Sequence, residues 1–212
     1  MVHRGRRTTL RKSLLLVPLF GAMALLPGAG FAGQPVTQTL NPPPAPFLTC
    51  MAVGSGTICQ GTRTISYGPD DTGIVCGSGA NAYDIFDAGT FTQRVTRYYD
   101  TEGNLTRRVA HEHYSLGQWR NPLSGATVSY TQNNVITDVL AVPGDRTSST
   151  ETITGEVIIR AATGAPVLIA TGRQVFNFDE SELISSAGRN AFIAAFFEGD
   201  TTAFDDVCAA LA

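Results

Sequence analysis

Lysine is almost missing from this chain of 212 residues, because Lys12 is its only one. The chain has 15 basic and 18 acidic residues, and five of the basic ones lie within the first twelve positions. Without those five, 10 arginines remain against 18 acids, a formal charge of −8. An acidic surface repels phosphate backbones and offers no basic stripe for anionic lipid. We therefore expect no nucleic acid partner and interpret the acidity as a solubility feature.

The chain also lacks an apolar run long enough for a membrane-spanning helix, which needs about 20 residues. Its candidate, residues 14–27, is about 14 residues long and contains Pro18 and Gly21. The run follows a basic stretch and precedes small residues that end in Ala32. This order predicts a cleavable secretory signal peptide over residues 1–32, a secreted, extracellular protein and no membrane span after cleavage. The pair Arg6-Arg7 leaves twin-arginine export open beside the general route.

Signatures of catalysis and metal binding are missing as well. The sequence has no G-x-S-x-G motif for a serine hydrolase, and a glycosidase pair cannot be singled out among its acids. It has no C-x-x-C motif and no Cys/His cluster. We therefore expect neither a metal nor a cofactor, and we favour a protein without enzymatic activity.

The four cysteines, in an exported chain, predict two disulfides. Cys59 and Cys76 bracket a stretch with glycine and proline that is typical of a hairpin. Cys50 and Cys208 lie near the two ends of the part that follows the leader. The expected pairing is therefore Cys59–Cys76 and Cys50–Cys208.

Segments rich in Thr, Val, Ile, Tyr and Phe alternate with turn residues, and none between them has the helical period of a parallel crossover. The expected strands are residues 57–67, 73–76, 82–87, 91–99, 105–114, 126–132, 135–142, 147–160, 167–178 and 182–186. Phe204, Val207, Cys208 and Leu211 share one face of a short C-terminal helix. The pattern predicts an all-β domain: an antiparallel up-and-down β-barrel of about eight strands, with a sandwich as the alternative.

The clearest hairpin spans residues 91–114 around a turn at residues 100–104, in which Gly103 takes the left-handed position. A regular register pairs Tyr99 with Leu105 and Val95 with Val109, with both valines facing inward. The same register puts four polar side chains on the inward face: Arg97, Arg107, His111 and His113.

These residues are the candidate ligand-binding set, together with Trp119, the only tryptophan. The two arginines could form a fork for a carboxylate, or could extend into water at a barrel mouth. The two histidines could reach one metal ion but have no evident third ligand, so ordinary hydrogen bonding is the favoured interpretation. Trp119 could close a barrel end or form part of a ligand mouth.

Several stretches together, RYYDTEGNLTRR, NPLSGATVSYTQ, VPGD, TGRQVF and CAALA, resemble exported proteins of unassigned function from high-GC Gram-positive bacteria, the actinobacteria. The resemblance covers most of residues 48–212 and implies no catalytic residue. By architecture alone, the strand layout is similar to calycin barrels such as lipocalins.

The domain organisation that we expect is a signal peptide at 1–32, a proline-rich extended segment or strap at 33–47, and one disulfide-bonded β domain at 48–212. The expected function is binding of a small apolar or amphipathic ligand by a secreted β-barrel. The alternatives are an enzyme of the cyclase or isomerase kind that uses the barrel interior, and a structural or surface-interaction protein with a filled barrel. The sequence leaves the oligomeric state open.

Overall fold

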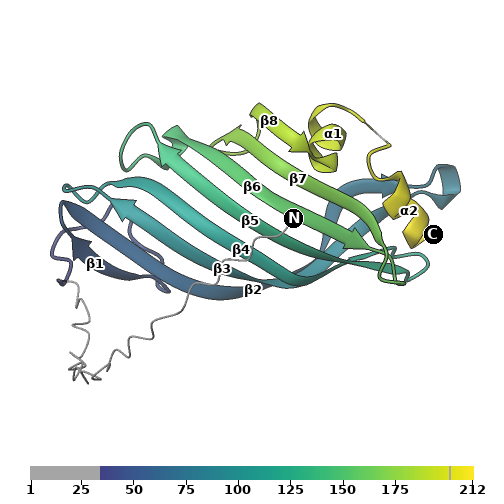
Figure 1. Ribbon diagram of the computed structural model, residues 1–212, viewed down its shortest axis with the longest axis horizontal. Coiled ribbons are helices and arrows are strands. Elements are labelled where there is room, and N and C mark those ends of the chain that lie inside the picture. The colour runs from purple at the N-terminus through teal and green to yellow at the C-terminus, as the bar shows by residue number, and fades with distance from the viewer. Residues whose placement is uncertain (1–33, 201) are drawn as a thin grey trace, which may run out of the picture. The chain divides into compact units, whose positions relative to one another are not determined.

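The computed structural model describes residues 34–200 and 202–212, so the expected signal peptide at 1–32 lies outside the described residues. The described part consists of one antiparallel sheet and two short helices (Figure 1). The strands are β1 Thr49–Val53, β2 Gly56–Cys76, β3 Tyr83–Tyr99, β4 Leu105–Arg120, β5 Thr127–Leu140, β6 Ser149–Arg160, β7 Pro166–Asn177 and β8 Leu183–Arg189. The helices are α1 Ala191–Phe197 and α2 Asp205–Leu211, and two single 3₁₀ turns lie at Gly79–Asn81 and Arg146–Ser148. None of the described helices is long and apolar enough to cross a membrane.

The eight strands follow one another across the sheet in chain order, which confirms the all-β, up-and-down prediction. Each strand pairs with its neighbour in the sequence because short turns connect them. Among the described residues, no ladder joins β1 to β8, so hydrogen bonds do not close the sheet into a barrel. The architecture is therefore a single open sheet whose inner face must be covered by other parts of the chain.

The inner face is the side of the sheet that carries Val95, Ala110, Ile136, Ile153 and Gln174, which lie opposite one another on β3 to β7. Val95 is 3% exposed and Ala110 is fully buried. The opposite, outer face carries exposed side chains such as His111 and Val135. The alternation along each strand therefore separates a covered side from a solvated one.

Ten expected segments become eight strands because three pairs of them merge. Gly68 and Pro69 interrupt the pattern of β2, but pairing with β3 continues on both sides of them after a register shift. Asn133 and Asn134 likewise lie within β5 and pair with β4 and β6. The missed strand is β1, a short edge strand that follows the proline-rich segment.

The described part of the proline-rich segment, residues 34–47, forms a strap over one end of the inner face, as expected. Leu40 packs with Cys59, Tyr99 and Leu105 in a small core. The Tyr99 hydroxyl donates a hydrogen bond to the carbonyl of Pro42 at 3.0 Å. The strap thus supplies apolar cover and backbone acceptors that a closed barrel would take from its own strands.

The two helices cover the other end of the inner face and form the larger core. Val207 and Leu211 of α2 are fully buried and belong to one cluster with Ile85, Trp119 and Ile159 of the sheet. The i, i+4 spacing puts both α2 residues on one face of the helix, as the sequence predicts. Each end of the inner face is therefore filled by a segment from a different end of the domain.

The disulfide framework is confirmed, but the expected pairing is wrong. Cys50 bonds to Cys59 across the β1–β2 hairpin, where the two residues are direct partners in the ladder. Cys76, at the end of β2, bonds to Cys208 of α2. The prediction failed because it missed β1, which brings Cys50 beside Cys59 and leaves Cys76 for the helix. Disulfides persist in oxidising compartments, so both bonds are consistent with an extracellular location.

The β3–β4 hairpin begins as predicted, with Gly103 at a φ of 86° and Tyr99 opposite Leu105. One residue later the register shifts, because Tyr98 pairs with Arg107 and leaves Thr106 as an extra residue. A shift of one residue exchanges the faces of the rest of β4. Val95 is buried as expected, but its partner is Ala110, and the inward placement expected for Val109 is wrong.

Candidate functional site

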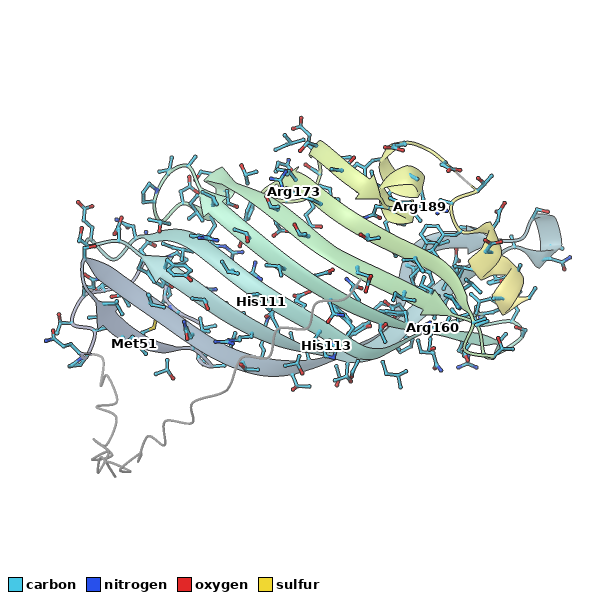
Figure 2. All side chains as sticks on the ribbon, viewed as in Figure 1. Met51, His111, His113, Arg160, Arg173 and Arg189 are labelled. Atoms are coloured by element: carbon cyan, nitrogen blue, oxygen red, sulfur yellow. A yellow bond between two sulfur atoms is a disulfide. The ribbon has the colours of Figure 1, made fainter. Side chains whose placement is uncertain are left out.

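The same bulge moves both histidines of the candidate set to the outer face. His111 pairs with Arg94 and His113 with Thr92, and both imidazoles are exposed (Figure 2). Together with Val135 they line a shallow depression of about 280 Å³. The Nδ1 atom of His113 lies 2.6 Å from Oδ1 of Asn133, an ordinary hydrogen bond. The two histidines are therefore together, but not on the inner face where the regular register put them.

Arg97 and Arg107 are separated by the same shift. Arg97 remains on the inner face, where its Nη1 donates to the carbonyl of Pro43 in the strap at 3.1 Å. Arg107 lies on the outer face, with its guanidinium 5.7 Å from the centre of the Tyr98 ring. The expected fork of these two side chains is not formed.

Trp119 lies in the core at the helical end of the sheet. It is 4% exposed and packs edge-on against Tyr130 and Phe192. This agrees with a tryptophan that closes one end of the interior. The candidate set is thus distributed over three places, and the polar groups of the inner face are different residues.

A row of charged side chains crosses the inner face where Arg97, Arg108, Asp138 and Glu151 lie opposite one another on β3 to β6. Arg108 donates to Oδ2 of Asp138 at 2.8 Å, and Asp138 is 6% exposed. Burial, followed by the neighbouring Asp138 carboxylate, raises the pKa of Glu151 to about 8. Glu151 is therefore protonated at neutral pH, and its proton supplies a donor to the otherwise unpartnered Oδ1 of Asp138.

A second polar cluster lies within the helical end of the core. The Tyr130 hydroxyl donates to both oxygens of Asp87, at 3.1 Å each, and contacts the Tyr67 hydroxyl. The Tyr130 ring occupies the space where a side chain on Gly117 would lie. Burial raises the pKa of Asp87, and of Tyr130. No described cavity opens onto this cluster, so it acts as a hydrogen-bonded part of the core.

The inner face is hollow between its two filled ends, beside α1. This cavity of about 280 Å³, called the aromatic groove below, is lined by Asn134 of β5, Gly155 of β6, Gln174 and Phe176 of β7, and Phe196 and Phe197 of α1. Asn190 caps α1 by accepting hydrogen bonds from the amides of Phe192 and Ile193. The cap fixes where the helix starts and so fixes its phenylalanines over the sheet. The Phe176 and Phe197 ring centres are 5.6 Å apart.

Gly155 makes the floor of the aromatic groove. It pairs with Gly172, which pairs in turn with Gly188, so three glycines lie side by side on β6, β7 and β8. A side chain at Gly155 would overlap the Asn134 amide and the Asn133 carbonyl. The floor is therefore bare backbone, and the space above it is kept by the absence of side chains.

Gln174 is the one lining residue whose hydrogen bonding is incomplete among those described. It is 6% exposed, and its Nε2 atom has no acceptor in the described residues. A buried amide donor without an acceptor costs about 1–3 kcal/mol. A ligand oxygen in the aromatic groove would remove that cost. Sequence reasoning missed this residue, although a glutamine between the inward Ala170 and Phe176 was a readable signal.

In the two described ranges, no three His, Cys, Asp or Glu side chains come close enough to hold a metal ion. Comparisons with protein-family models, with curated proteins and with solved structures give no match. The functional argument therefore depends on the chemistry of the chain itself.

Proposed function

We propose that this is a secreted protein that binds small, neutral or cationic amphipathic molecules in the aromatic groove. The observation that carries the proposal is the buried Nε2 donor of Gln174, which lines an otherwise largely aromatic cavity and has no acceptor. Binding sites for small molecules combine apolar walls with a few fixed polar groups, and this groove has both.

The charge of the groove selects against anions. Glu156 and Glu180 line it, and its described lining residues include no lysine or arginine. Aromatic rings attract cations through their negative faces, so an ammonium group is compatible with the phenylalanines of α1. A ligand oxygen that accepts from Gln174 and an apolar or cationic body therefore suit the site, whereas a carboxylate is repelled.

The volume of the groove limits the size of the ligand. A water molecule occupies about 30 Å³ of liquid, so the space of about 280 Å³ corresponds to roughly nine water molecules. A ligand of about ten non-hydrogen atoms fills it. This is at the lower end of the range for small-molecule sites, about 300–1,000 Å³.

The test compares three probes with one alkyl chain and different heads: heptanol, heptylamine and heptanoate. Calorimetry or NMR titration of the mature protein at neutral pH is expected to give binding of the alcohol and the amine, and binding of the carboxylate at least tenfold weaker. Gln174→Leu keeps the volume and removes the donor, which should weaken the alcohol roughly tenfold, equal to about 1.4 kcal/mol.

The matched control is Gln118→Leu, because Gln118 is exposed on the outer face of β4. It should leave the affinity for heptanol unchanged. Equal affinity of Gln174→Leu and the wild-type protein would contradict the role of the amide. Absence of binding for all three probes at millimolar concentration, or preference for heptanoate, would contradict the proposed function.

A structural or surface-interaction protein is the second candidate. The observation that favours it is that the strap and the helices fill most of the inner face. In that case the aromatic groove is a packing defect, and recognition takes place on the sheet edges.

A further inference from the structure

The sheet has an incomplete edge at the start of β7. Residues 171–176 of this strand pair with β8, and the last pair of the ladder is Thr171 with Arg189. Residues 166–170 pair with β6 on one side, and in the described part of the chain no strand lies on the other side. Figure 1 shows β8 ending at α1 while β7 extends beyond it toward α2.

The edge is left open because the chain turns away after Arg189. Asn190 caps α1 and so ends β8 five residues before the start of β7 is covered. Within the described ranges, the backbone of residues 166–170 makes no hydrogen bond outside its own sheet pairing. An extended segment on this side would continue the line of β8 and satisfy the edge-facing amides and carbonyls.

A groove of about 770 Å³ lies along this open edge. It is lined by Val167 and Ile169 of β7, by Arg189, by the end of α1 and by the start of α2. Ile169 is 48% exposed, so the edge offers an apolar side chain beside its free backbone groups. The five open residues span about 17 Å at roughly 3.3 Å per residue, the length of a short peptide strand.

Acidic side chains surround this edge groove. Glu198, Asp200, Asp205 and Asp206 line it, against the single basic Arg189. All four acids are exposed, and none of them is in the one described salt bridge of the domain. Complementary charge on a bound strand therefore comes from lysine or arginine side chains.

We propose that the edge groove binds an extended basic peptide, which adds to residues 166–170 as an antiparallel strand. Backbone hydrogen bonds supply the affinity, and the four acids select a basic sequence over an acidic one. This recognition surface is separate from the aromatic groove, and its test does not depend on the small-molecule proposal.

The test uses a synthetic hexapeptide of alternating Lys and Val, its Glu and Val counterpart, and two N-methylated forms that differ in which alternate amides are methylated. Titration of the mature protein by NMR at low salt should show binding of the basic peptide with slowed amide exchange at Val167 and Ile169. The acidic peptide should not bind. One methylated form should lose binding, because its methyl groups face β7, and the other should keep it.

A matched pair of variants tests the charge. Glu198→Gln with Asp206→Asn should weaken the basic peptide about three- to tenfold, and the difference should shrink at higher salt. Asp84→Asn with Glu102→Gln removes two exposed acids elsewhere and should leave the affinity unchanged. The proposal is overturned if both methylated forms bind like the parent, if the acidic peptide binds equally, or if no peptide binds at millimolar concentration.

Discussion

The two disulfides allow a quantitative prediction, because they differ mainly in the length of chain that they close. Cys50 and Cys59 are separated by 9 residues, and Cys76 and Cys208 by 132. In the chain-entropy model the short bridge contributes about 2.7 kcal/mol to the free energy of unfolding and the long one about 5 kcal/mol. A domain of this size is stable by about 5–15 kcal/mol, so the long bridge supplies a third or more of that.

Each pair consists of one buried and one half-buried sulfur, so replacement of both members by alanine leaves similar cavities. Urea unfolding of the two double-alanine variants under oxidising conditions should therefore give a loss about 2 kcal/mol larger for Cys76→Ala with Cys208→Ala. Equal losses, or a larger loss for the hairpin bridge, would refute the loop-length argument and show that native contacts decide the contribution of each bond.

Three further changes test the inner face. Folding raises the pKa of Glu151 from 4.5 to about 8, so its contribution to stability is present in acid and is lost as pH rises through 8; Glu151→Gln should flatten that fall in urea midpoints measured at pH 5 and pH 8, and a parallel fall would contradict it. Val95→Ala should cost about 1–3 kcal/mol and the exposed His111→Ala less than about 0.5 kcal/mol, and the reverse order in thermal melts would show that the faces are assigned wrongly. Gly117→Ala should cost about 1–3 kcal/mol through overlap with the Tyr130 ring, and less when combined with Tyr130→Ala in a double-mutant cycle; additive costs would argue against that contact.

Strand content, order and the main turn follow from local sequence. Residues 100–104 predict their own turn because Asp100 accepts the amides of Glu102 and Asn104 and Gly103 adopts a positive φ. Bulges do not follow from local sequence. Thr106 has no feature that marks it as an extra residue, and one such residue changes the face of every later side chain of β4.

The candidate site was harder to predict because it is formed by distant segments. Gln174 becomes a buried, unpartnered donor only when α1 packs over β7, and no spacing within either element reports that contact. The disulfides failed for a related reason. Cys50 lies beside Cys59 because the short strand β1 exists, and its five residues carry little strand signal of their own.

The long bridge also imposes an order on the assembly of the domain. The Cys50–Cys59 bond can form as soon as the first hairpin has emerged from a ribosome or an export channel, since both sulfurs lie within one hairpin. The bond from Cys76 cannot form until 132 further residues, including six strands and α1, have emerged. An oxidised Cys76–Cys208 pair therefore reports that α2 has reached the sheet, and a free Cys76 thiol marks a chain that quality-control factors can recognise as unfinished.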